Sequence, residues 1–161
     1  THQGDGFSLI PVRSAADLSA TIELFRAYAS ALDIELSYQD FEAELAAMPG
    51  KYAPPAGELL LARDIAGQPV GCVALRPLPE LGCCEMKRLY VSPGGRGLGL
   101  GRELVDAVLA VARNIGYREM RLDTLPTMLS AIGLYRTSGF APIQPYYDTP
   151  IADTVFLGRS L

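Results

Sequence analysis

Apolar and polar residues alternate along this chain with two periods, one typical of helices and one typical of strands. Leu18, Ile22, Phe25 and Ala29 follow one another at steps of three and four residues, which predicts a helix with one core-facing side. Short apolar runs between turn residues indicate strands. The pattern predicts strands over residues 7–12, 58–64, 68–76, 83–91, 118–124, 140–146 and 154–159, and helices over residues 15–32, 39–48, 99–115 and 128–137.

Capping and turn residues mark the ends of several of these elements. Ser14 and Ser37 stand where the side chain of a helix N-cap is expected, and Pro49 with Gly50 ends the second helix. The pair at residues 66–67 predicts a tight turn, so the two strands around it form a hairpin. Residues 51–57 are expected to form a loop. The third helix is expected to bury Leu104, Val108, Val111 and Ala112.

Composition places the chain among ordinary globular domains. Of its 161 residues, 49% are apolar and 20% are charged, which suits a single mixed α/β domain over residues 7–161 after a disordered segment at residues 1–6. No apolar run reaches the length of a membrane span, and residues 1–6 lack signal-peptide character, so a cytoplasmic location without membrane contact is expected. A net charge of −4 argues against nucleic acid as a partner.

Histidine and cysteine usage restricts the possible chemistry. The single histidine, His2, lies near the start of the sequence, so catalysis by histidine and histidine-containing metal sites are not expected. Two of the three cysteines, Cys83 and Cys84, are adjacent, a geometry unsuited to an ordinary structural disulfide. Reduced thiols and no bound metal are therefore predicted.

Residues 91–104 hold five glycines and one proline directly before an apolar helix pattern. Glycines let the backbone approach a ligand, and the first amides of a helix lack partners within it, so this segment predicts an anion site for a phosphate-bearing ligand. A P-loop is excluded because Arg102 and Glu103 follow Gly101 where Lys and Ser or Thr are required. A dinucleotide loop fits Gly99 and Gly101, but its third glycine position falls on Leu104.

A third interpretation takes Arg96, Gly99 and Gly101 as the R/Q-x-x-G-x-G/A pyrophosphate loop. Upstream lies a strand that ends in Val-x-Pro, and residues 131–140 read A-x-x-L-Y-x-x-x-G-F, about forty residues after the loop. In the order and spacing of these motifs the chain resembles the GCN5-related N-acetyltransferase (GNAT) superfamily, strongly over residues 86–140 and loosely elsewhere. The resemblance implies a mostly antiparallel mixed sheet, flanked by helices and splayed between its fourth and fifth strands.

The resemblance also implies acetyl-CoA (coenzyme A) as co-substrate, held in that splay without a metal. The amides near residues 97–102 would bind the pyrophosphate, and the strand at residues 89–91 would pair with the pantetheine arm, with the Leu89 amide at the thioester carbonyl. Relatives often carry Asn where this chain has Met128, a departure that Ser130 could partly offset. The implied cofactor-binding residues are Leu89, Tyr90, Val91, Arg96, Gly97, Leu98, Gly99, Leu100, Gly101, Arg102, Ser130 and Tyr135.

Two residues are candidates for proton transfer. Tyr135 matches the tyrosine that protonates the sulfur of coenzyme A in many family members, although it could also serve packing alone. Glu85 lies eleven residues before Arg96, where one branch of the family carries a catalytic glutamate, and could act as a general base. A salt bridge with Lys87, which shares its strand face, is the alternative for Glu85.

The expected activity is transfer of an acetyl group to a primary amine by direct attack, with a small-molecule or peptide acceptor. The acceptor site is expected near residues 31–38 and 144–147, where Glu35, Asp40 and Asp148 could attract an amine. A coenzyme A-binding module without catalysis is the main alternative, and an NAD-dependent oxidoreductase is a second one. The sequence leaves monomer and homodimer open.

Overall fold

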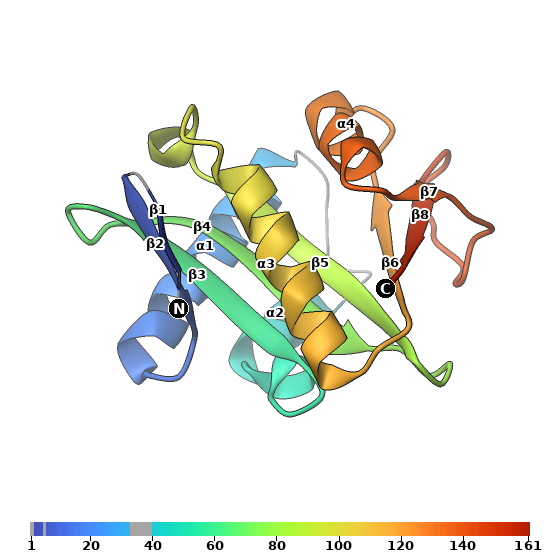
Figure 1. The fold of residues 1–161 in the computed structure, drawn as a ribbon, viewed down its shortest axis with the longest axis horizontal. Helices are drawn as coiled ribbons and strands as arrows, with labels where there is room; N and C mark the ends of the chain where they lie inside the picture. The colour runs from blue at the N-terminus through green and yellow to red at the C-terminus, as the bar shows by residue number, and fades with distance from the viewer. Residues whose placement is uncertain (1, 5, 33–39) are drawn as a thin grey trace.

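The computed structural model describes residues 2–4, 6–32 and 40–161 (Figure 1). The strands are β1 (His2–Gly4), β2 (Phe7–Pro11), β3 (Glu58–Asp64), β4 (Pro69–Pro77), β5 (Cys83–Val91), β6 (Glu119–Thr124), β7 (Ala141–Pro142) and β8 (Val155–Ser160). The helices are α1 (Ala15–Ala31), α2 (Phe41–Ala46), α3 (Leu100–Ile115) and α4 (Leu129–Thr137), with 3-10 turns at Gly50–Tyr52 and Pro93–Gly95. Most of the predicted elements are therefore present.

All eight strands form one sheet in the order β1-β2-β3-β4-β5-β6-β8-β7. Neighbouring strands are antiparallel except for β5 and β6, which are parallel and joined through α3. Helix α3 covers one face of the sheet, and α1 and α2 cover the other (Figure 1). The predicted fold class, a mostly antiparallel mixed sheet flanked by helices, is confirmed.

Strands β5 and β6 pair over only three positions, from Cys83 with Glu119 to Glu85 with Arg121. Beyond these pairs β5 continues to Val91 along β4, while β6 continues to Thr124 along β8. The sheet therefore opens between β5 and β6. These are the fourth and fifth of the strands predicted from the sequence, so the opening lies where the resemblance implies. Helix α4 lies beside this opening (Figure 1).

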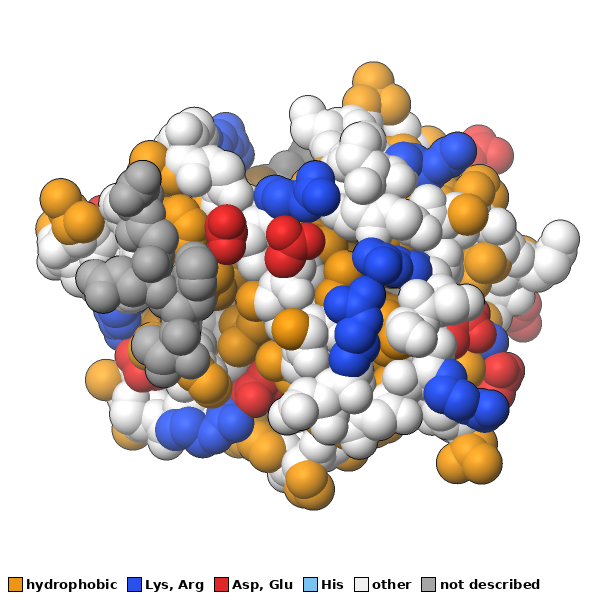
Figure 2. Space-filling model, in the orientation of Figure 1, with side chains coloured by type: hydrophobic (Ala, Val, Ile, Leu, Met, Phe, Trp, Pro, Cys, Tyr) orange, Lys and Arg blue, Asp and Glu red, His pale blue; other side chains and the backbone are white. Residues whose placement is uncertain are grey.

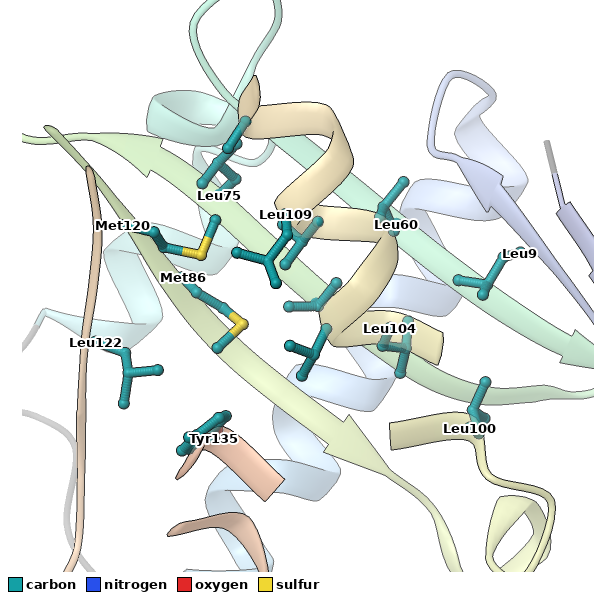
Figure 3. Packing of buried hydrophobic residues seen from close by; sticks show 14 of the residues in the cluster. Leu9, Leu60, Leu75, Met86, Leu100, Leu104, Leu109, Met120, Leu122 and Tyr135 are labelled. Carbon is teal, nitrogen blue, oxygen red and sulfur yellow. The ribbon is translucent and has the colours of Figure 1, made fainter. Parts of the chain in front are cut away.

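The core has two parts, one on each face of the sheet. Helix α3 turns Leu104, Val105 and Val108 into the larger part, and its two ends are capped by left-handed glycines, Gly99 and Gly116. Figure 3 shows this part, with leucines from α3 packed against side chains of the sheet. The smaller part lies under α1 and α2; the predicted cap of α1 is present, because Ser14 accepts a hydrogen bond from the Asp17 amide.

A β-bulge interrupts β5, where Arg88 and Leu89 lie opposite the single residue Val73 of β4. Arg88 has a φ of 58°, in the left-handed region. Its buried guanidinium lies 3.1 Å from Glu44 of α2, so it points to the α2 face, whereas Leu89 packs toward the α3 core. The bulge thus reverses the alternation of β5 directly before the strand reaches the glycine-rich loop.

Three elements differ from the sequence-based expectation. The second helix spans only Phe41–Ala46 and begins after Asp40; the expected cap Ser37 lies outside the described residues. The predicted loop at residues 51–57 includes the end of a 3-10 turn. The predicted strand at residues 140–146 is reduced to Ala141–Pro142, because proline provides no amide for a longer ladder and Pro145 follows three residues later.

The expectation of a disordered segment at residues 1–6 was wrong in its central part. Residues His2–Gly4 form β1, which pairs with β2 from His2 opposite Leu9 to Gly4 opposite Phe7. Strand β2 offers an open edge, and Gly6 takes a φ of 86° that makes the reversal possible. Periodicity alone could not reveal this strand, since its three residues, His2, Gln3 and Gly4, include no apolar side chain.

The surface on the α3 face carries Lys and Arg side chains interspersed with Asp and Glu (Figure 2). Within the described part of the chain, no helix has both the length and the apolar character needed to cross a membrane.

The pair of Arg88 and Glu44 yields a first prediction. Burial acts to raise the pKa of Glu44, but the hydrogen bond and charge of Arg88, with the charge of Lys51, lower it overall. Replacing Glu44 with Gln removes the charge that Glu44 supplies to a buried guanidinium, so we expect the free energy of unfolding at pH 7 to fall by about 3 kcal/mol. Because the pKa of Glu44 is lowered in the folded state, the pair stabilises fully above the pKa of an unfolded glutamate and is lost as acid protonates Glu44.

Denaturant unfolding measures this loss. The control is Glu42→Gln on the same helix, whose carboxylate is 75% exposed and pairs with the exposed Arg26, and which should cost no more than about 0.5 kcal/mol. Equal effects of the two substitutions would contradict the prediction.

Candidate active site

Two adjoining cavities occupy the opening between β5 and β6. The first, here called the groove, has a volume of about 500 Å³ and extends from the glycine-rich loop along β5 to α4. The second, here called the inner cavity, has a volume of about 60 Å³ and lies deeper between the two strands. The two cavities share the lining residues Tyr28, Leu32, Leu89, Leu125 and Met128. A ligand in the groove can therefore reach into the inner cavity.

The glycine-rich loop forms one end of the groove. Gly97 and Gly99 have φ values of 84° and 70°, and a Cβ added to either would meet no atom within 4 Å. Glycine is thus favoured there by the backbone conformation and not by lack of space. Helix α3 begins directly after Gly99 without a side-chain cap, so its first amides are available to an anion.

The structure divides the expected loop residues into two groups. Arg96 and Gly101 line the groove. The side chain of Leu100 is buried in the core, and that of Arg102 lies 3.4 Å from Asp106 one turn further along α3. For these two residues, as for residues 97–99, only the backbone can serve a ligand in the groove.

The β5 edge forms the floor of the groove. Leu89, Tyr90 and Val91 all line it, and they follow the last position at which β5 pairs with β6. An unpaired strand edge presents amides and carbonyls to which an extended ligand can bind. Ser130 lines the opposite side, at the start of α4.

Met128 stands at the N-cap of α4 and lines both cavities. Its sulfur accepts a hydrogen bond from the Thr124 hydroxyl at 3.7 Å. Met128 therefore connects the start of α4 to the end of β6 and offers no polar amide to the groove.

Tyr135 lines the inner cavity from α4. Its ring is 7% exposed and packs edge-on against Phe140, and Figure 3 places it beside Met86 and Leu122 at the border of the core. Burial, with smaller contributions from Tyr28 and Asp123, raises the pKa of Tyr135. The phenol therefore keeps its proton at neutral pH and can donate it.

Glu85 lies in an enclosed network beside the inner cavity. It is 1% exposed, its Oε1 lies 2.7 Å from Arg76 Nε, and its Oε2 accepts a hydrogen bond of 2.6 Å from Tyr146. The expected pair with Lys87 is present but longer, at 3.9 Å. Glu85 lines neither of the two cavities.

Among the described residues, Asp123 is the carboxylate that lines the inner cavity. It lies on β6, and its partner is the Tyr147 hydroxyl, which donates a hydrogen bond to Oδ2. Burial raises the pKa of Asp123, and the opposing charge of Lys87 does not cancel this effect. No role could be assigned to Asp123 from the sequence. Its position among the alternating Met120, Leu122 and Thr124 does predict that its side chain faces away from the α3 core.

The expected acceptor regions are only partly represented at this site. Leu32 and Tyr147 line the inner cavity, while residues 33–39, including Glu35, lie outside the described residues. Asp40 lines a separate cavity near Lys51, and Asp148 lines neither the groove nor the inner cavity.

The three cysteines are free and buried. Burial raises the pKa of Cys83 to about 11 and that of Cys84 to about 12, so both remain thiols. Cys83 does lie near the carboxylates of Glu80 and Glu119, but Arg121 binds both carboxylates, at 2.8 Å and 3.0 Å. A guanidinium thus already supplies the positive charge at this cluster.

Comparison with known proteins agrees with this geometry. The model of the Acetyltransferase (GNAT) family matches residues 18–140. An uncharacterized N-acetyltransferase of Schizosaccharomyces pombe is 43% identical over 150 residues, which cover 93% of this chain and 92% of that relative.

Two solved structures share the fold. An acetyltransferase of the GNAT family from Staphylococcus aureus Mu50 has a TM-score of 0.79 at 21% identity, covering 96% of this chain and 98% of that chain. A GNAT superfamily phosphinothricin acetyltransferase from Sinorhizobium meliloti, solved in complex with AcCoA, has a TM-score of 0.72 at 22% identity, covering 97% of this chain and 89% of that chain. The family match and the 43% identical relative together show that this chain belongs to the Acetyltransferase (GNAT) family.

Proposed function

We propose that this protein transfers an acetyl group from acetyl-CoA to a primary amine by direct attack of the amine. The observation that carries the proposal is the continuity of the site. One groove runs from the open amides of α3, along the unpaired edge of β5, to a cavity that holds Tyr135. The AcCoA bound by the Sinorhizobium neighbour supports the choice of donor.

The residues of the groove fit the parts of coenzyme A in order. The amides of residues 97–102 and the Arg96 guanidinium suit the pyrophosphate, because both carry positive charge toward the groove. The edge at residues 89–91 suits the pantetheine arm, which contains two amides able to pair with a strand. Ser130 and Met128 of α4 close the other side.

Leu89 lines both cavities and therefore lies where the groove meets the inner cavity. At this position its amide is suited to bind the thioester oxygen and to stabilise the negative charge that develops as the amine attacks. A single such donor contributes about 3 kcal/mol in comparable sites. The bulge at Arg88 fixes the backbone direction at this point.

Tyr135 is the proposed general acid, since its protonated phenol lies in the inner cavity and can donate to the departing sulfur. Among the described residues, neither cavity is lined by a thiol that could form an acetyl-enzyme. Glu85 remains a prediction as general base; its two oxygens are engaged by Arg76 and Tyr146, which does not favour direct contact with an acceptor.

A catalytically inactive coenzyme A-binding module remains the alternative. Such a module would need the groove but not a buried phenol at its inner end, so the position of Tyr135 favours the enzyme. The NAD-dependent alternative loses support, because the sheet is mostly antiparallel and its strand order is not that of a doubly wound fold.

The donor site can be tested through Gly99. In Gly99→Ala a residue that carries a Cβ must adopt a φ of 70°. This backbone conformation is unfavourable for alanine, so the loop shifts and its amides no longer converge. We expect the affinity for acetyl-CoA, measured by titration calorimetry, to fall about tenfold, which corresponds to ~1.4 kcal/mol. Gly116→Ala is the matched control, since Gly116 caps the other end of α3 with a φ of 112°. It should cost stability and leave the affinity unchanged; a wild-type protein that binds NAD in place of acetyl-CoA would contradict the proposal.

The acid role can be tested through Tyr135. Tyr135→Phe keeps the packing of the ring but removes the hydroxyl group that would donate the proton. We therefore expect kcat to fall about 10- to 100-fold with acetyl-CoA affinity unchanged. Release of the coenzyme A thiol reports turnover with a panel of primary amines. Tyr117→Phe serves as the control, because the Tyr117 hydroxyl binds the Ala56 carbonyl outside both cavities. An unchanged kcat in Tyr135→Phe would remove the acid role.

A further inference from the structure

Two carboxylates, the buried Glu85 and the half-buried Asp123, lie on neighbouring strands and face the same side of the sheet. Each accepts a hydrogen bond from one of two consecutive tyrosines in the segment between β7 and β8. We call these four residues, with Arg76 and Lys87, the polar layer. Ionisable groups beside a cavity are common at functional sites. The partners of each carboxylate therefore bear on which of the two could bind a substrate.

The charges around Glu85 are already balanced. Arg76 lies 2.7 Å from one oxygen and the Tyr146 hydroxyl 2.6 Å from the other, while Lys87 Nζ lies 3.9 Å away. An approaching ammonium ion would have to displace one of these groups. Glu85 is therefore suited to hold Arg76 and Lys87 in place and is poorly suited to receive a substrate.

Asp123 has a different environment. It lines the inner cavity together with Leu89 and Tyr135, and it accepts a hydrogen bond from a neutral hydroxyl, that of Tyr147. The charges facing it come from β5, where Lys87 and Arg88 oppose Glu85. Tyr135 on α4 lines the same cavity as Asp123. The charge of Asp123 contributes to raising the pKa of Tyr135.

We propose that Asp123 binds the ammonium group of the acceptor and accepts its proton before attack. The inference rests on the proposed function, because it needs an amine acceptor and a thioester at Leu89. A carboxylate on β6 and a phenol on α4 then lie at one cavity, with the reacting carbonyl at Leu89 of β5. Lys87, the cationic member of the polar layer that lines the cavity, carries the same charge as an ammonium ion and cannot bind it.

The protons balance in this arrangement. Asp123 takes one proton from the ammonium ion and later releases it to solvent. The neutral amine attacks the thioester carbon, so that a C–N bond forms and the C–S bond breaks. Tyr135 gives its proton to the departing sulfur, and the second proton lost by the nitrogen restores Tyr135 through water.

Asp123→Asn tests this role, because Asn keeps the shape and the acceptor oxygen of the side chain but cannot take a proton. The probes are tyramine, spermidine, glycine and L-lysine, with thiol release as the readout, for whichever of these the wild type acetylates best. We expect kcat/KM at pH 7 to fall about 100-fold with acetyl-CoA affinity unchanged. The deficit should shrink as the pH rises toward the pKa of the amine, since neutral amine then forms in solution.

Glu119→Gln is the matched control. Glu119 is a carboxylate on the same strand, four residues earlier, and it lies outside both cavities in contact with Arg121. Its kcat/KM and pH profile should match those of the wild type. A structural effect of Asp123→Asn would lower activity equally at every pH, and that result would overturn the proposal.

Tyr147→Phe provides a second test that keeps the carboxylate. A hydrogen bond to the ionised form lowers the pKa of a carboxyl group, so its removal should move the acid limb of the kcat/KM profile to higher pH by about one unit. An unmoved acid limb would overturn the role of Asp123.

The outcomes also separate the two proposals. If the wild type binds acetyl-CoA but acetylates none of the amines, the proposed function fails and the role of Asp123 fails with it. If the wild type is active and both variants have unchanged pH profiles, only the role of Asp123 is overturned.

Discussion

The site depends on one constraint, the loss of pairing between β5 and β6 after three residue pairs. From that point each strand remains in the sheet through its other neighbour, β4 for β5 and β8 for β6. The unpaired edge of β5 must then find other partners for its backbone groups, since buried amides and carbonyls without partners are costly. A ligand that runs along the strand meets this requirement, so the same break in the sheet creates both the space and the binding surface.

Buried charges surround this opening in pairs that fix particular positions. Arg88 is bound by Glu44 of α2, which holds the bulge at the point where β5 changes direction. Arg76 is bound by Glu85, which holds the polar layer against β4. Because both pairs lie within one sheet face, small shifts of α2 or of the segment between β7 and β8 are resisted by charged hydrogen bonds on either side of the inner cavity.

Much of this arrangement could be predicted from the sequence, because it depends on signals that are local in the sequence. The bounds of β3 and β5, the helix at residues 100–115, the glycine loop and Tyr135 all depend on periodicity, caps or motif spacing. The bulge at Arg88 could not be predicted, since no turn residue marks it. The roles of Glu85 and Asp123 could not be separated either, because the difference comes from Arg76, Tyr146 and Tyr147, which only the folded sheet brings near them.

Two consecutive tyrosines connect the segment between β7 and β8 to both strands of the opening. Tyr146 is bonded to a carboxylate on β5, and Tyr147 is bonded to a carboxylate on β6. Both rings also pack against Phe156 of β8, at 5.4 Å and 5.3 Å. One short segment is therefore bonded to β5 at the last pair of the two strands, Glu85 with Arg121, and to β6 two residues further on. If the acceptor binds in the inner cavity as proposed, the hydrogen bond between Tyr147 and Asp123 limits the width available to it, so a bulkier acceptor could enter only by displacing that bond.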